Sequence, residues 1–156
     1  MNFIPNSIHA RDVQSIVHPQ TNLKKHQEIG PMLVTHGEGV RIFDDNGQDY
    51  IESVAGLWCA SLGFGVERLA TVAYEQMRTL GYYHSYRHRT NEPNIILAEK
   101  LLSIAPVPMS KVLFQCSGSE ANDTAIKLVW YYHNAIGKPE KCKIIGRKMG
   151  YHGSTV

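Results

Sequence analysis

Apolar residues recur at the spacing of one helical face in several segments of this 156-residue chain. The predicted helices cover residues 7–17, residues 66–80, residues 91–104 and a stretch that runs on from residue 121. Ser7 and Asn91 are suitable N-caps for two of these helices, and Gly81 ends a third.

Shorter patterns predict strands in two regions. Residues 32–52 indicate an antiparallel meander, with turns at residues 37–39 and at Asn46-Gly47. Residues 111–115 and 142–146 are short apolar runs of the kind that form buried strands. A helix and small meander followed by strand, helix and strand is typical of the α/β class. Two such strands are too few for a complete doubly wound sheet.

Composition excludes several classes of protein. Hydrophobic residues make up 43% of the chain, charged residues 19%, and the net charge is +2. This composition is ordinary for a globular protein and provides no basic surface for nucleic acid. No apolar run approaches the roughly 20 residues of a membrane span, and the N-terminus lacks a signal-peptide pattern. We therefore expect a cytoplasmic protein with no nucleic-acid or membrane partner.

The cysteines and histidines form no recognisable motif. Cys59, Cys116 and Cys142 are odd in number and far apart, which predicts reduced thiols. Among eight histidines, only His84 and His88 stand four residues apart, in a segment without a helical apolar period. No metal site is predicted from this spacing.

The turn Ser117-Gly118-Ser119 opens directly into the helix that contains residue 121. Unpaired N–H groups and the positive end of the dipole make such a helix start a site for an anion. Gly118 permits close approach of the backbone, and the neighbouring hydroxyls add donors, so phosphate is the natural ligand. A simple capping box formed by Ser117 and Glu120 explains the same residues equally well. The pattern alone leaves both interpretations open.

Four segments, in the same order and at compatible distances, resemble the class III aminotransferases, which are fold-type I enzymes that depend on pyridoxal phosphate (PLP). They are GVRIFDDNGQDYIESVAGLWCASLGFG (39–65), GYYHSYRHRTNEP (81–93), VLFQCSGSEANDTAIKL (112–128) and IGRKMGYHGST (145–155). The AGLWC and GYHGST motifs are most similar to those of amine–pyruvate, or omega, transaminases. The resemblance implies the N-terminal part of an α/β fold-type I transferase. Residues 1–57 would be a small-domain segment, and residues 58–156 would begin the large PLP-binding domain.

The resemblance also implies cofactor-binding roles. Gly118 and Ser119 would bind the PLP phosphate through backbone N–H groups and the Ser119 hydroxyl, while Ser117 shapes the turn. Tyr151 would lie against the face of the pyridine ring. His152 would support Tyr151 or the cofactor pocket, or would have only a packing role.

Two aromatic residues have implied substrate roles. Trp58 would line the substrate pocket and set its width. Tyr86 would face a substrate in the active site of the other subunit, because these enzymes place their active sites at a homodimer interface.

The implied reaction moves an amino group from a primary amine or omega-amino acid to a keto acid such as pyruvate. In the family, the Schiff-base lysine and the aspartate that holds the pyridine nitrogen both follow the GYHGST motif. Both are therefore expected beyond Val156, and we expect these 156 residues to be inactive alone. Two alternatives remain: a non-catalytic phosphate-binding or dimerising protein, and another class III PLP enzyme such as an aminomutase or decarboxylase.

Overall fold

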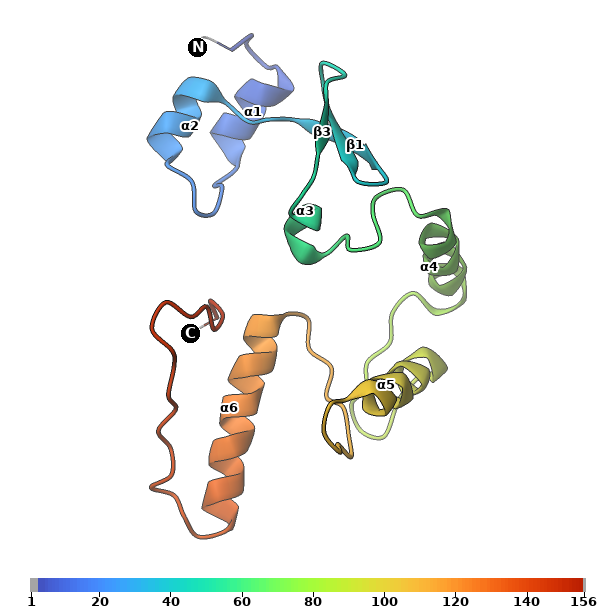
Figure 1. Ribbon diagram of the computed structural model, residues 1–156, viewed down its shortest axis with the longest axis vertical. Helices are drawn as coiled ribbons and strands as arrows, with labels where there is room; N and C mark the ends of the chain where they lie inside the picture. The colour runs from blue at the N-terminus through green and yellow to red at the C-terminus, as the bar shows by residue number, and fades with distance from the viewer. Residues whose placement is uncertain (1–2, 156) are drawn as a thin grey trace. The chain divides into compact units, whose positions relative to one another are not determined.

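The computed structural model describes residues 3–155; Met1, Asn2 and Val156, at the ends of the two predicted domains, lie outside the described residues. The elements are α1 (Ile8–Ser15), α2 (Leu23–Ile29), β1 (Val34–Glu38), β2 (Arg41–Asp44), β3 (Asp49–Ile51), α3 (Ala55–Trp58), α4 (Glu67–Leu80), α5 (Glu92–Ile104) and α6 (Gly118–Ala135) (Figure 1). Contacts divide the chain into two compact units, Met1–Tyr82 and Tyr83–Val156. The predicted domain boundary between residues 57 and 58 stays a prediction.

The first unit begins with a pair of short helices. Helix α1 starts where the sequence predicts, because the Ser7 hydroxyl accepts a hydrogen bond from the Ala10 N–H at 3.2 Å. Helix α2 was not predicted, since its seven residues contain few apolar positions. It starts at a second cap, in which the Asn22 side chain accepts from the Lys25 N–H at 3.1 Å.

The predicted meander is confirmed as a three-stranded antiparallel sheet in the order β1-β2-β3. Glu38 pairs with Arg41, so the first turn consists of residues 39 and 40 and lies later than the predicted 37–39. Gly37 instead pairs with Ile42 inside β1 and β2. The second turn falls at Asn46-Gly47 as predicted, where the Gly47 N–H donates to the Asp44 carbonyl at 3.1 Å.

Asp44 organises that second turn. Its carboxylate accepts hydrogen bonds from the Asn46 and Gln48 N–H groups, both at 2.9 Å, and from the Tyr50 hydroxyl at 3.0 Å. Burial disfavours the charged carboxylate, but these hydrogen bonds outweigh it and hold the pKa of Asp44 below its ordinary value. The same contact raises the pKa of Tyr50, because its hydroxyl donates to a charged carboxylate.

The segment after the sheet folds back on the first hairpin. Gly39 and Phe64 form an antiparallel bridge, with N–H to carbonyl distances of 3.1 and 2.8 Å. A Cβ on Gly37 would lie 2.6 Å from the Phe64 ring, so the ring covers the bare backbone of β1. Helix α4 follows, ends at Gly81 as predicted, and is exposed along its length.

The second unit contains two predicted helices and two segments that were predicted as strands. Helix α5 starts at the predicted cap, where the Asn91 side chain accepts from the Asn94 N–H at 3.1 Å. Residues 111–115 and 142–146 are not paired as strands, which differs from the sequence-based prediction. The Trp130 Nε1–H donates to the Cys142 carbonyl at 2.7 Å, and the second segment runs beside α6 (Figure 1). A strand needs a paired neighbour for its backbone groups, and these residues make no such ladder within the described chain.

No hydrophobic side chain is buried in residues 3–155; the buried residues there are His26 and Asp44. Helix caps, tight turns, the sheet and polar contacts therefore hold the described chain, while its apolar faces remain uncovered. Within the same residues, no helix has the length and apolar character needed to cross a membrane.

Candidate functional site

The start of α6 is built by its own capping residues. The Ser117 hydroxyl accepts from the Glu120 N–H at 3.2 Å, and the Glu120 carboxylate accepts from the Cys116 N–H at 2.9 Å. This is the reciprocal pattern of a capping box, reaching back one residue further than usual. The predicted cap is therefore confirmed, and the Glu120 carboxylate has a structural role in it.

The cap leaves the N–H groups of the next two residues available. Gly118 and Ser119 are the first residues of α6, where a helix provides no internal acceptor for the amide hydrogens. A Cβ added to Gly118 would meet no atom within 4 Å, so open space lies in front of this turn. Positive dipole, free amides and open space together fit an anionic group such as a phosphate.

The segment 150–155 packs on this helix start. The Ser154 N–H donates to the Ser119 hydroxyl at 3.1 Å, and the Asn122 side chain donates to the His152 carbonyl at 2.9 Å. Thr155 adds a hydrogen bond from its hydroxyl to the Asp123 carboxylate. The closing motif is thus attached to the first turn and a half of α6.

Gly153 allows this close packing. Its φ is +117°, and a Cβ there would lie 2.9 Å from the Ser119 Cα. A side chain would need both an unfavourable backbone conformation and a displaced neighbour. Steric crowding therefore explains why glycine occupies position 153 of the GYHGST motif.

Tyr151 and His152 belong to the same packed segment. Hydrogen bonds from the Ser119 and Ser154 hydroxyls lower the pKa of Tyr151, although burial acts in the opposite direction. The phenol is therefore directed at the helix start, while 79% of the residue is exposed. His152 Nε2 would lie 2.7 Å from a Cβ on Gly150, so its ring covers that glycine.

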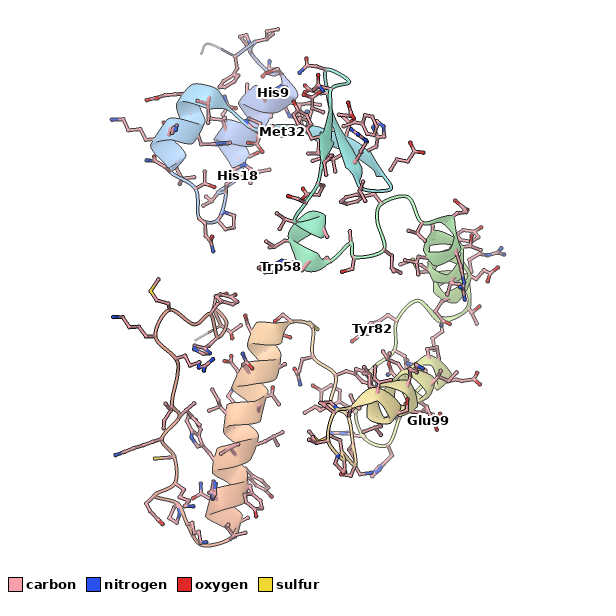
Figure 2. The ribbon with its side chains drawn as sticks, viewed as in Figure 1. His9, His18, Met32, Trp58, Tyr82 and Glu99 are labelled. Atoms are coloured by element: carbon pink, nitrogen blue, oxygen red, sulfur yellow. The ribbon has the colours of Figure 1, made fainter. Side chains whose placement is uncertain are left out.

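The two predicted substrate residues are exposed on separate units. Trp58 is 78% exposed in the first unit, and Tyr86 is 77% exposed in the second (Figure 2 labels Trp58). The Tyr86 N–H donates to His84 Nδ1 at 3.2 Å, which fixes the backbone of its loop. The structure brings Tyr151, His152 and the turn 117–119 together, whereas Trp58 and Tyr86 each have only local surroundings.

Trp58 is carried by an unusual turn that the sequence did not predict. Ala55, Gly56, Leu57 and Trp58 all have positive φ values, between 50° and 66°. The Trp58 N–H donates to the Val54 carbonyl at 2.8 Å, so α3 is a single left-handed turn. Non-glycine residues adopt this conformation at a cost, and such turns occur where a side chain must be displayed in a particular direction.

Comparisons with known proteins agree with the motifs. The family model described as Aminotransferase class-III matches residues 23–156. Vanillin aminotransferase from Capsicum chinense is 48% identical over 129 residues, which are 82% of this chain and 28% of that protein. An omega transaminase from Pseudomonas jessenii, solved in complex with PMP, has a TM-score of 0.94 and 54% identity over 96% of this chain and 33% of its own.

A related solved structure is a thermostable omega transaminase variant with a tryptophan-to-glycine substitution, engineered for asymmetric synthesis of enantiopure bulky amines. It has a TM-score of 0.94 and 52% identity, over 96% of this chain and 33% of its own. The chain therefore spans about a third of the length of the relatives it matches.

These matches confirm the predicted fold, the N-terminal part of a PLP-dependent fold-type I transferase. The cofactor of class III aminotransferases is PLP, and the free amides, open space and hydroxyl at the start of α6 fit its phosphate. This chain belongs to the class III aminotransferases.

Proposed function

We propose that this chain forms the phosphate-binding and substrate-lining part of a PLP-dependent aminotransferase. The longer enzyme would transfer an amino group from a primary amine or omega-amino acid to a keto acid such as pyruvate. The observation that carries the proposal is the packing of residues 150–155 on the open start of α6.

At the helix start, the Gly118 and Ser119 N–H groups hold the cofactor phosphate, and Ser117 keeps the turn in shape. The Ser119 hydroxyl accepts from the Ser154 N–H, so it keeps its own proton for a second partner. That partner is the Tyr151 phenol or a phosphate oxygen. The contact therefore leaves the Ser119 hydroxyl able to donate to one of these two partners.

Tyr151 and His152 complete the cofactor side of the site. Tyr151 is largely exposed, so an aromatic plane is available for stacking on the pyridine ring. The His152 ring covers Gly150, and the His152 carbonyl accepts a hydrogen bond from the Asn122 side chain. These contacts fix the backbone on both sides of Tyr151.

Trp58 and Tyr86 are assigned to the substrate pocket. Both rings are largely exposed here, as expected for side chains that contact a ligand or a second subunit. The relative engineered for bulky amines carries a tryptophan-to-glycine change, which supports a width-setting role for Trp58. Tyr86 would contribute to the site of the other subunit in a homodimer.

When bound, PLP supplies an electron sink for the substrate carbon that exchanges its proton. The residues of this chain bind and orient that group, while the catalytic lysine and aspartate are expected beyond Val156. The three cysteines are exposed and free of disulfides. Such thiols support placing the enzyme in the reducing cytoplasm.

The test uses the longer protein that carries this chain, purified with PLP. A primary amine such as 1-phenylethylamine, or the omega-amino acid 4-aminobutyrate, should bleach the cofactor absorbance, and pyruvate should restore it. Bleaching that no keto acid reverses, with release of carbon dioxide, would identify a decarboxylase instead. A protein that binds phosphate but never PLP would identify a non-catalytic role.

A further inference from the structure

Three side chains with metal-binding atoms converge between α1 and α2. The His18 Nε2 lies 3.1 and 2.9 Å from the two Asp12 carboxylate oxygens, and the His26 Nε2 lies 3.0 Å from the nearer one. One ligand atom from each residue lies within 4.8 Å of the others. The two imidazole rings are 4.4 Å apart at their centroids and tilted by 50°, so both aim at the same carboxylate.

This cluster is partly shielded from solvent. The side-chain exposure is 9% for His26, 14% for Asp12 and 32% for His18.

Sequence spacing did not single out these residues. Asp12 lies on α1, His18 precedes Pro19 in the connecting segment, and His26 lies on α2. The separations of six and eight residues match no common metal motif. The helical pair has to fold before the three side chains meet.

We propose that Asp12, His18 and His26 form a binding site for a divalent transition-metal ion, with Zn²⁺ as the best match. Two imidazole nitrogens and one carboxylate are ordinary Zn²⁺ ligands, with bonds of about 2.0–2.2 Å. Tetrahedral geometry then places ligand atoms roughly 3.3 Å apart. The nitrogen–oxygen pairs at 2.9–3.1 Å need to separate by only a few tenths of an ångström.

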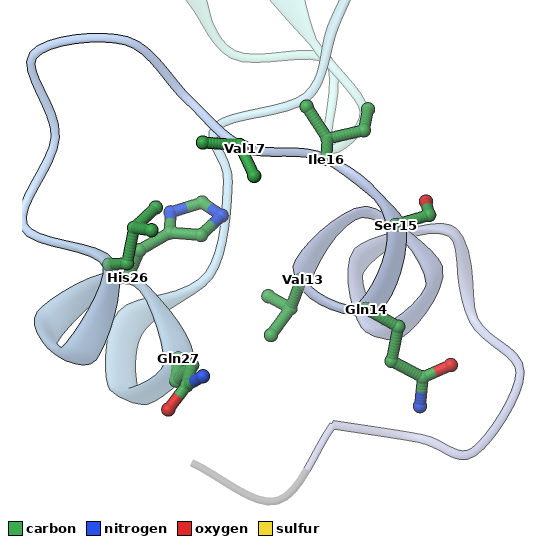
Figure 3. Close-up of a pocket in the computed structure, with 8 residues that line it drawn as sticks. Val13, Gln14, Ser15, Ile16, Val17, His26 and Gln27 are labelled. Atoms are coloured by element: carbon green, nitrogen blue, oxygen red, sulfur yellow. The ribbon is translucent and has the colours of Figure 1, made fainter.

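A cavity adjoins one of the three proposed ligands, His26. A cavity of about 170 Å³ lies beside His26, lined partly by the polar side chains of Gln14, Ser15 and Gln27. Figure 3 shows His26 reaching from α2 toward the end of α1 at this cavity. Water can occupy the fourth position, since His18 is the most exposed of the three ligands.

The bound ion would stabilise the pair of helices α1 and α2. Helices α1 and α2 have eight and seven residues, which is too short for stability in isolation, and no hydrophobic side chain is buried in either. A metal ion bound by both helices and their connection would fasten residues 12–26 in place of a core. This role is independent of the proposed transamination.

The test measures Zn²⁺ binding to the longer protein that carries this chain by calorimetry, with Co²⁺ absorption as a second probe. The protein should carry no polyhistidine tag and should be free of PLP, because both bind metal ions. We expect one ion per chain and a higher unfolding temperature when Zn²⁺ is added. His26→Ala and Asp12→Asn should each weaken Zn²⁺ binding at least tenfold. Asp12→Asn keeps the shape of the side chain and guards against a variant that simply fails to fold.

His9→Ala is the matched control. His9 lies on α1 and pairs with Asp45 at 3.3 Å, outside the cluster. Its replacement should leave Zn²⁺ binding unchanged. Either of two binding results would overturn the proposal, namely no Zn²⁺ or Co²⁺ binding by the unaltered protein, or binding that is equal in the His26→Ala variant; a stability result would do the same. A loss of stability in Asp12→Asn that is the same with and without Zn²⁺ would show that the cluster is only hydrogen-bonded.

Discussion

The Ser154 N–H donates to the Ser119 hydroxyl at 3.1 Å, across 35 residues of sequence. This contact fixes the closing motif at the residue proposed to bind the cofactor phosphate. A substitution that breaks this hydrogen bond should weaken cofactor binding, because Ser119 contributes both its amide and its hydroxyl to the helix start.

Gly153→Ala should weaken PLP binding about tenfold, or ~1.4 kcal/mol. The added Cβ would lie 2.9 Å from the Ser119 Cα, at a φ of +117°. A PLP titration of the longer enzyme, followed by absorbance, measures the effect. Gly137→Ala is the control, since Gly137 also has positive φ but a Cβ there meets nothing within 4 Å. Equal losses in both variants would show that backbone strain alone is responsible.

Gly118→Val should lower PLP affinity without a loss of stability. A Cβ at Gly118 would meet no atom within 4 Å, so we expect the turn to accommodate the larger side chain, which crowds the proposed phosphate site. Thermal unfolding without cofactor should change little, while PLP binding falls at least tenfold. Unchanged PLP affinity would contradict the assignment of the start of α6 as the phosphate-binding site.

Trp58→Gly should shift substrate preference toward bulkier amines by about tenfold in relative kcat/KM. Trp58 is largely exposed at a φ of 66°, a conformation that glycine adopts without strain. Its loss should therefore widen the pocket without destabilising the fold. Leu57→Gly relieves the same backbone conformation at φ 60° and should not alter substrate preference. A similar shift in both variants would assign the effect to the turn rather than to the indole.

Asp44 should make the stability of the sheet depend on acidity. Its pKa in the folded state lies below the unfolded value near 3.8, so its contribution is complete above pH 4 and is lost as the pH falls through the folded pKa. Asp44→Asn should flatten this part of an acid-unfolding curve followed by circular dichroism.

Tyr50 should make the stability of the sheet fall at alkaline pH. Its pKa is raised in the folded state, so its contribution to stability is complete below pH 10 and is lost above it. Tyr50→Phe should remove that alkaline loss, and curves that match the unaltered protein would refute the assignment.

The isolated 156 residues should bind a hydrophobic dye and aggregate at micromolar concentration. No hydrophobic side chain is buried in residues 3–155, and the apolar face of α4 is uncovered. Sedimentation and dye fluorescence measure both properties. A soluble monomer that unfolds cooperatively would contradict this expectation.

Features that depend on neighbouring residues were predictable from the sequence. The caps at Ser7, Asn91 and Ser117 follow from side chains that reach amides three residues ahead. The Asn46-Gly47 turn is similarly local, since only four residues define it. The turn Ser117-Gly118-Ser119, which we propose to bind phosphate, belongs to this group, although the pattern could not separate an anion site from a simple cap.

Features that depend on distant partners were not predictable in the same way. Residues 111–115 and 142–146 have strand-like patterns, yet strand pairing requires neighbours that their patterns do not specify. The left-handed turn at Trp58 is also invisible to hydrophobic periodicity, because several residues other than glycine adopt positive φ there.

By itself, the sequence determined the caps at Ser7, Asn91 and Ser117, the Asn46-Gly47 turn and the likeness to the family, because each rests on short-range geometry or on a contiguous motif. Only the tertiary structure decided that Ser154 packs on Ser119 and that Asp12 meets His26. Those contacts arise when separate helices and loops come together, and their distances follow from packing rather than from spacing along the chain.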